Sequence, residues 1–275
     1  MLQLKALWLT ALPGDTPEDV SRFFDRVYRP EECLVMEEDG LPVSMAFLLP
    51  AHLPVQEENL SLQYVYAAAT RPDRRGKGLF SALLRAALER GRKQGAAASF
   101  LRPADAGLQE YYGRFGYRPF FRVRVVDCGR TTLLTAEPAG VTPCRVTDYA
   151  ALRGAFLQDI RRAVRWPDRL AVYEAESVEK SGGFLLAGRD GFALCEPRSD
   201  GDGTRLLTRE LLCRPGREKA MMAAVAAHYP ADAYRFRLPA GEAEPDTEGF
   251  GLLCPLSRRA EGLFAGHGYM GPAFD

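Results

Sequence analysis

The stretch "TRPDRRGKGLF", residues 70–80, lies between an almost uncharged run, "LQYVYAAAT" at 62–70, and the segment "SALLRAALERGRK" at 81–93. The first run predicts a strand, and apolar residues four positions apart in the second predict an amphipathic helix. A charged turn with glycines often only connects such elements. Glycines before a helix also let backbone N–H groups approach a ligand, and the helix N-terminus carries partial positive charge. The stretch therefore predicts either a plain turn or a loop that binds a phosphate or pyrophosphate.

The composition of the chain limits its partners. The 275 residues include 36 Lys+Arg and 36 Asp+Glu, so the formal net charge is zero. This length fits one large domain or, better, two of ordinary size. Because there is no global cationic field, we expect neither nucleic acid nor an anionic membrane as partner. Any anion site must then be local.

Leader, membrane and metal signals are weak in this sequence. The N-terminal "MLQLKALWLTALPGDT" lacks a basic leader and a cleavage motif, and no later segment approaches the roughly 20 apolar residues of a membrane span. We expect a soluble, cytoplasmic protein. The six cysteines form no C-x-x-C pair and the three histidines lie far apart, so we expect free thiols and no metal site.

The first half of the chain reads as a mixed α/β domain. "TPEDVSRFFDRVY" predicts a helix with Thr16 as N-cap and Pro17 at the first helical position. "CLVMEEDGLPVSMAFLLP" predicts a hairpin that turns at Asp39 and Gly40. We further expect a strand at 62–69, a helix at 81–94, a short strand in 95–104, a short helix in 107–117, and one long strand or a strand pair at 118–127.

The second half resembles a degenerate copy of the first. Residues 204–240 repeat the order strand, Arg-Pro turn, alanine-rich helix and strand, and they close on "FRLPA" where the first half closes on "FLRPA". They run from "CRPGRE" into the helix, with no counterpart of "DRRGKG". We therefore expect similar α/β domains at 1–127 and 144–275, joined by a linker or first strand at 128–143. Only the first keeps the glycine loop.

Residues 70–80 can be compared with three kinds of phosphate-binding loop. The pattern G-x-x-x-x-G-K-[ST] fails, because Arg71 stands at its first glycine and Gly78 follows the lysine. The dinucleotide pattern G-x-G-x-x-G is half met, with Ser81 in the third place and no acid at the core of the next strand. An acyl-CoA pyrophosphate loop fits better.

Two motifs carry a family resemblance. "TRPDRRGKGLFSALL" resembles motif A of the GNAT superfamily of acyl-CoA-dependent N-acetyltransferases, Arg/Gln-x-x-Gly-x-Gly/Ala, with Arg75 and Gly78 in place. Phe80 departs from it, since Gly or Ala is usual there. "YYGRFGY" resembles motif B, whose tyrosine falls on Tyr112. The stretch "YGRFGY" and the two-domain layout are similar to those of acetyltransferases of the enhanced-intracellular-survival type. The similarity is good over the first 126 residues and weak over the rest of the chain.

This resemblance implies tandem GNAT-like mixed sheets flanked by helices, with a degenerate second copy. It implies an N-acetyltransferase that moves an acetyl group from acetyl-CoA to a primary amine of a small molecule or peptide. Tyr112, in preference to Tyr111, would protonate the leaving thiolate. Small residues at the strand end would border the acyl-pantetheine arm, and main-chain N–H groups of the loop would bind the pyrophosphate, with added charge from Arg74, Arg75 and Lys77. The implied cofactor residues are Ala68, Ala69, Thr70, Arg75, Gly76, Lys77, Gly78, Leu79, Phe80 and Ser81.

Several points stay open at the level of sequence. A non-catalytic acyl-CoA-binding or sensing module is the alternative, and it would keep the loop without needing Tyr112. The general base is unassigned: Glu37 and Glu38 lie by the hairpin turn, and the resemblance to three-domain enzymes brings in the terminal carboxylate of Asp275. The acceptor, the role of the second domain, the effect of Phe80 on the loop and formation of a homo-oligomer are open as well.

Overall fold

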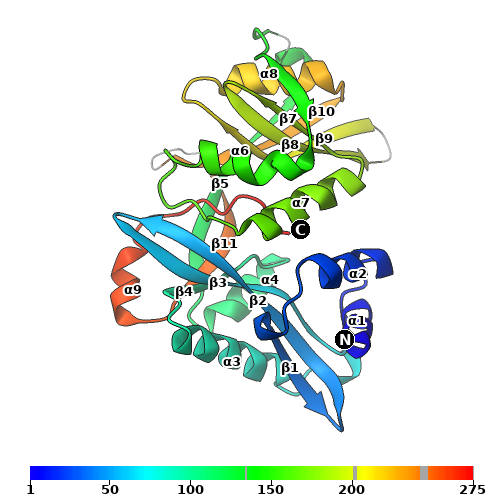
Figure 1. The fold of residues 1–275 in the computed structure, drawn as a ribbon, viewed down its shortest axis with the longest axis vertical. Helices are drawn as coiled ribbons and strands as arrows, with labels where there is room; N and C mark the ends of the chain where they lie inside the picture. Colours follow the sequence, from blue (N-terminus) through cyan, green and yellow to red (C-terminus); the bar gives the residue numbers. More distant parts are fainter. Residues whose placement is uncertain (134, 201–202, 242–246, 275) are drawn as a thin grey trace. The chain divides into compact units, whose positions relative to one another are not determined.

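The computed structural model describes residues 1–133, 135–200, 203–241 and 247–274 (Figure 1). The chain forms two compact units. Unit 1 comprises Met1–Phe120 with Gly251–Gly266, and unit 2 comprises Phe121–Phe250 with His267–Asp275. The units are thus not the contiguous stretches 1–127 and 144–275 expected above, because β11 (Thr247–Pro255) pairs antiparallel with β4 (Ala98–Leu101).

Unit 1 contains a mixed sheet with the strand order β1-β2-β3-β4-β11. Its strands pair antiparallel except β3 and β4, which run parallel over Leu62–Tyr64 and Ala98–Phe100. Its other elements are α1 (Leu2–Ala11), α2 (Pro17–Arg26), η1 (Pro30–Glu32), β1 (Cys33–Glu38), β2 (Leu41–Val55), β3 (Glu58–Thr70), η2 (Pro72–Arg74), α3 (Leu79–Lys93), α4 (Ala106–Gly113), the start of β5 (Arg118–Gly129) and α9 (Arg258–Leu263).

The N-terminal helices show what the sequence pattern did and did not reveal. The predicted helix after Thr16 is confirmed as α2, which begins with a capping box formed by Thr16 and Asp19. Helix α1 was not predicted, although its buried residues Leu4, Leu7, Trp8 and Ala11 follow helical spacing. The segment was interpreted only as a short apolar stretch, so the site residues that α1 contributes were missed.

Helices cover both faces of the sheet in unit 1. On one face the Trp8 ring of α1 lies 5.3 Å from Phe47 of β2 and 5.9 Å from Tyr66 of β3. The other face packs against α3 and α4, whose buried side chains form one apolar cluster with residues of the strands. The buried residues of this second cluster are Ala46, Leu48, Val65, Leu83, Leu84, Ala87, Leu88, Leu101, Tyr112, Tyr117, Leu252, Cys254 and Leu256. The alternation along β2 and β3 therefore separates two apolar layers.

Unit 2 repeats this plan with the strand order β5-β10-β9-β8-β7-β6. β9 and β10 run parallel, as β3 and β4 do, and α8 connects them. The predicted mixed α/β fold and the repeat at 204–240 are confirmed in this form. The elements are α5 (Arg130–Leu133), β6 (Val141–Cys144), η3 (Val146–Asp148), α6 (Tyr149–Phe156), α7 (Asp168–Lys180), β7 (Phe184–Gly188), β8 (Gly191–Asp200), β9 (Gly203–Cys213), α8 (Glu218–His228) and β10 (Ala233–Pro239).

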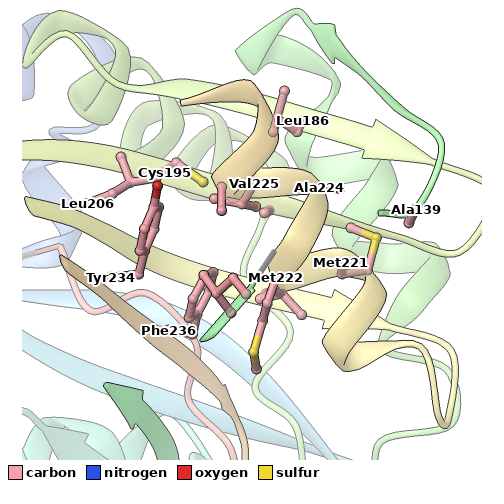
Figure 2. Packing of buried hydrophobic residues seen from close by; sticks show 14 of the residues in the cluster. Ala139, Leu186, Cys195, Leu206, Met221, Met222, Ala224, Val225, Tyr234 and Phe236 are labelled. Atoms are coloured by element: carbon pink, nitrogen blue, oxygen red, sulfur yellow. The ribbon is translucent and has the colours of Figure 1, made fainter. Parts of the chain in front are cut away.

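The core of unit 2 lies between α8 and the sheet. Figure 2 shows Met222 and Val225 of α8 beside Tyr234 and Phe236 of β10, in a cluster that also includes Cys195 of β8. Alanines elsewhere on α8 let the helix approach the strands closely, which accounts for its alanine-rich sequence. On the opposite face, Tyr149 and Phe156 of α6 pack their rings against Phe192.

None of the helices in the described residues is both long and apolar enough to cross a membrane. All six cysteines are free thiols. Within the described part of the chain, no group of three or more His, Cys, Asp or Glu side chains is placed to hold a metal ion.

Candidate functional site

The end of β3 is bulged and extends beyond its parallel neighbour. In the pairing with β2, Met45 lies opposite Ala69 but Phe47 lies opposite Tyr66, so β3 carries an extra residue there. Ala67 has φ 43, a left-handed conformation that costs energy for a residue with a side chain and is often found at functional sites. β3 runs on to Thr70 after its last pair with β4, Tyr64 opposite Phe100. Backbone groups near the strand end are therefore not all used by the sheet.

The loop after β3 leads directly into the N-terminus of α3. Gly76 and Gly78 have φ 77 and 76, and Gly78 is the N-cap of α3. A Cβ at Gly78 would meet no atom within 4 Å, so the backbone conformation and not lack of space requires glycine. Gly78 offers no side-chain cap, and the first N–H groups of a helix have no intrahelical acceptor. The loop therefore presents backbone donors and the positive end of a helix dipole to an anion.

The arginines next to the loop are largely engaged within unit 1. Arg71 donates to both carboxylate oxygens of Asp73, at 2.6 and 2.9 Å, and holds the pKa of that carboxyl below its usual value. Arg74 donates to Glu38 at 2.8 Å and to Asp73 at 2.9 Å. Much of the cationic charge seen in the sequence is thus balanced by neighbouring acids. Lys77 makes no hydrogen bond or ion pair with any residue that the structure describes.

The strand end, the loop and α4 surround one cavity of about 540 Å³ in unit 1. Of the residues predicted from the resemblance, all but Lys77 line it. Residues of α1 and α4 that the sequence analysis did not assign to the site line it as well. The lining consists of Ala11, Leu12, Ala68, Ala69, Thr70, Arg74, Arg75, Gly76, Gly78, Leu79, Phe80, Ser81, Leu108, Tyr111 and Tyr112. Residues far apart in the sequence therefore meet at the mouth of α3.

Tyr111 and Tyr112 both line this cavity but differ in their contacts. The hydroxyl of Tyr111 forms a 2.8 Å hydrogen bond with Ser81 Oγ at the start of α3. Tyr112 is only 8% exposed, and burial raises the pKa of its phenol to about 12, with smaller contributions from Tyr111 and Asp105. Its hydroxyl is protonated at neutral pH, as that of a phenol with the ordinary pKa of 10 would be, and can act as a hydrogen-bond donor.

Phe80, which departs from motif A, belongs to an aromatic wall. Its ring centroid lies 5.7 Å from that of Tyr111 and 6.2 Å from that of Tyr112. It also packs against the apolar cluster under α3. The bulky side chain thus supports the two tyrosines while its backbone remains in the first turn of the helix.

Among the described residues that line this cavity there is no aspartate, glutamate or histidine that could serve as the general base. Neither Glu37 nor Glu38 lines it, and Glu38 is paired with Arg74. Asp275, whose carboxylate was the other candidate, lies outside the described residues.

Unit 2 has a cavity of about 390 Å³ with different chemistry. Glu218, the first residue of α8, contributes to its wall and pairs with Arg124 at 2.7 Å. A carboxylate at a helix N-terminus is favourable there, but it would repel a phosphate. The lining comprises Asp159, Ile160, Arg161, Arg162, Glu218, Pro239, Ala240, Gly241, His267, Gly268 and Tyr269.

Comparison with known proteins agrees with the motifs. Residues 1–120 match the family model described as an acetyltransferase (GNAT) domain. The GNAT resemblance is therefore confirmed for this part of the chain. A comparison with curated proteins finds no match.

Solved structures with the same fold extend the likeness to most of the chain. A GCN5-related N-acetyltransferase from Kribbella flavida is 20% identical with a TM-score of 0.67, over 88% of this chain and 65% of that one. Eis1 from Mycobacterium abscessus is 14% identical with a TM-score of 0.69, over 93% of this chain and 70% of that one. A GCN5-related N-acetyltransferase from Anabaena variabilis is 14% identical with a TM-score of 0.77, over 93% of this chain and 70% of that one. At these identities the likeness shows the fold alone.

Proposed function

We propose that the protein is an acyltransferase that moves an acetyl group from acetyl-CoA to a primary amine of a small molecule or peptide by direct transfer. The observation that carries the proposal is the cavity of unit 1, where the bulged end of β3, the glycine loop of α3 and Tyr112 converge. The match of residues 1–120 to the acetyltransferase (GNAT) domain supports acetyl transfer as the chemistry.

The binding of acetyl-CoA would use groups of different character. The free N–H groups at the start of α3 would donate hydrogen bonds to the pyrophosphate, since they combine unsatisfied donors with the helix dipole. The acyl-pantetheine arm would lie against Ala68, Ala69 and Thr70, where the strand end leaves β4 and the side chains are small. Phe80 and Leu108 would give this arm an apolar wall.

Tyr112 would act on the departing sulfur. When the amine attacks the thioester carbonyl, the C–S bond breaks and negative charge develops on sulfur. The protonated phenol of Tyr112 can donate a hydrogen bond to that sulfur and then its proton. Tyr111 is less suited, because its hydroxyl is already engaged with Ser81. The group that takes the proton from the amine is not assigned.

A thiol-release assay with acetyl-CoA tests this function across alkylamines, peptides and aminoglycosides. We expect release that depends on both acetyl-CoA and one class of amine. Calorimetry with CoA is run beside it. Tight CoA binding without thiol release for any amine would contradict the enzyme and support the non-catalytic acyl-CoA-binding or sensing module. Absence of CoA binding would contradict both.

A further inference from the structure

Arg75 differs from the neighbouring arginines in what it binds. Arg71 and Arg74 donate to carboxylates, whereas Arg75 donates to two main-chain carbonyls. Its Nε lies 3.2 Å from the oxygen of Thr70, at the end of β3, and its Nη2 lies 3.0 Å from the oxygen of Ala11, at the end of α1. One guanidinium thus joins two elements that are far apart in the sequence.

The carbonyl of Ala11 lies in the last turn of α1, where the C-cap residue Leu12 donates its N–H to the carbonyl of Trp8 and not to that of Ala11. The last carbonyls of a helix have no intrahelical donor, and cations near them are stabilising. The last turn of α1 contains no basic residue. Arg75 supplies both the missing donor and the positive charge from 64 positions along the chain.

The end of α1 is also a wall of the candidate site. Ala11 and Leu12 line the same cavity as the strand end and the tyrosines. Trp8, one turn earlier, packs against Tyr66, which adjoins the bulge residue Ala67. Loss of the Arg75 bonds would therefore release one wall of the cavity from the other.

We propose that Arg75 is a positioning residue, which holds the end of α1 against the end of β3 and so sets the shape of the cavity around the thioester. This inference rests on the proposed function. It assigns to the Arg75 side chain a role other than charge at the pyrophosphate, because two of its donor nitrogens are committed to carbonyls. Lys77, which has no partner among the described residues, is the matched cation for a phosphate role.

Two acetyl donors separate these roles. Acetyl-CoA carries the pyrophosphate, and S-acetyl-pantetheine carries the same thioester without it. We expect Arg75→Gln to lower kcat/KM about 10-fold with both donors, since the shape of the cavity serves both, and Arg75→Lys to behave alike because an ammonium lacks the fork that reaches two carbonyls. We expect Lys77→Gln to lower kcat/KM about threefold with acetyl-CoA only, and less at high salt. An Arg75→Gln loss confined to acetyl-CoA, or full rescue by Arg75→Lys, would overturn the proposal.

Hydrogen exchange on the ligand-free protein tests the same contact without activity. We expect the last-turn amides of α1 to exchange about fivefold faster in Arg75→Gln and at the wild-type rate in Lys77→Gln. Equal exchange in wild type and Arg75→Gln would overturn the positioning role. If wild type released no thiol from either donor, the proposed function would fail, yet the exchange rates would still decide what Arg75 does.

Discussion

The connection from β3 to α3 in unit 1 and that from β9 to α8 in unit 2 occupy the same place in two copies of one plan. Both leave a strand that runs parallel to the next, and both strands are bulged. In unit 2, Leu194 pairs with Glu210 and Cys195 with Thr208, so Arg209 is the extra residue. The second copy therefore has the same topology as the first and a bulge in the corresponding strand.

What differs is the side chains around the bulge. Unit 1 has Ala67, Ala68 and Ala69 there, beside an open cavity. Unit 2 has Arg209, bonded to Glu196 at 2.5 Å, and next to it the fully buried Glu210. Glu210 accepts hydrogen bonds from Tyr149, Arg153 and Tyr269. Beside its bulge the second copy thus has a buried network of paired polar side chains, whereas the first has a cavity.

The arginines are engaged in both loops, and the difference lies at the first residue of the helix, which is Leu79 in α3 and Glu218 in α8. The arginines of the unit 2 turn donate to the carbonyl of Arg189 and the carboxylate of Asp190, and Glu218 occupies the start of the helix. Gly216 is left-handed, like Gly78, so the backbone conformation alone does not distinguish the two loops. A left-handed glycine before a helix without a side-chain cap is therefore common to both loops. What distinguishes the loop of unit 1 is the small residues beside it and the absence of a carboxylate from the first turn of its helix.

The largest effect is expected on stability, when Glu210 is removed from the buried polar network of unit 2. Glu210→Ala leaves the buried guanidinium of Arg153 without its counter-charge, and such losses cost about 3–5 kcal/mol of the free energy of unfolding. Chemical denaturation measures this. Glu248→Ala, which breaks the exposed pair with Arg235, is the control and should cost less than about 1 kcal/mol. Equal costs would show that the buried network is not what stabilises the second copy.

The next effect concerns the two left-handed glycines. Gly78→Glu should weaken acetyl-CoA binding at least about 100-fold, or about 2.8 kcal/mol, because it places a carboxylate at the anion site. Gly216→Glu imposes similar backbone strain, with equally open space for the Cβ, and should leave the affinity unchanged. Calorimetry on both variants decides the assignment. Normal affinity in Gly78→Glu, or an equal loss in Gly216→Glu, would count against the loop of unit 1.

Within unit 1, the two tyrosines can be compared directly. Tyr112→Phe should lower kcat about 100-fold with little change in acetyl-CoA affinity, because only the proton donor is lost. Tyr111→Phe removes the bond to Ser81 and should cost about 1 kcal/mol of stability, with a kcat change below about threefold. Steady-state kinetics and denaturation separate the two. Unchanged turnover in Tyr112→Phe would remove this residue from the mechanism.

The smallest effect is on the alkaline side of the pH profile. The pKa of Tyr112 is about 12 in the folded protein against 10 for a free phenol, so the folded state keeps this proton longer. The stability that this shift contributes is present below pH 10 and is lost as pH rises through 12. We expect kcat/KM to rise as the amine deprotonates near its reference pKa of about 10.4, with no decline from Tyr112 in that range. A decline centred near pH 10 that Tyr112→Phe abolishes would show an unshifted phenol.

Sequence patterns predicted the local elements well because their signals are local. Thr16 with Pro17 marked the start of α2, and Asp39 with Gly40 marked the hairpin, where both adopt left-handed conformations. The glycine loop and Tyr112 were found through motif spacing, and both line the cavity. Helix α1 was missed, although its apolar spacing was visible, and so were the contributions of Ala11 and Leu12.

The return of the chain to unit 1 could not be read from any local pattern. β11 adds to β4 through pairs between residues far apart in the sequence, such as Leu252 with Leu101. The resemblance of residues 204–240 to the first half suggested two contiguous domains because repeats show internal similarity, not strand exchange between copies.

The sequence by itself determined the α/β plan, its repetition and the loop with two glycines, Gly76 and Gly78, in the first copy against the single Gly216 in the second, because backbone conformation and apolar periodicity depend on near neighbours. Only the tertiary structure decided what the charged residues do. Arg75 binds the ends of α1 and β3, Arg74 is held by Glu38, and Glu210 gathers partners from α6 and the C-terminal segment. A long side chain is flexible and its partner is chosen by distance in space, so its role becomes visible only once the fold has brought the partners together.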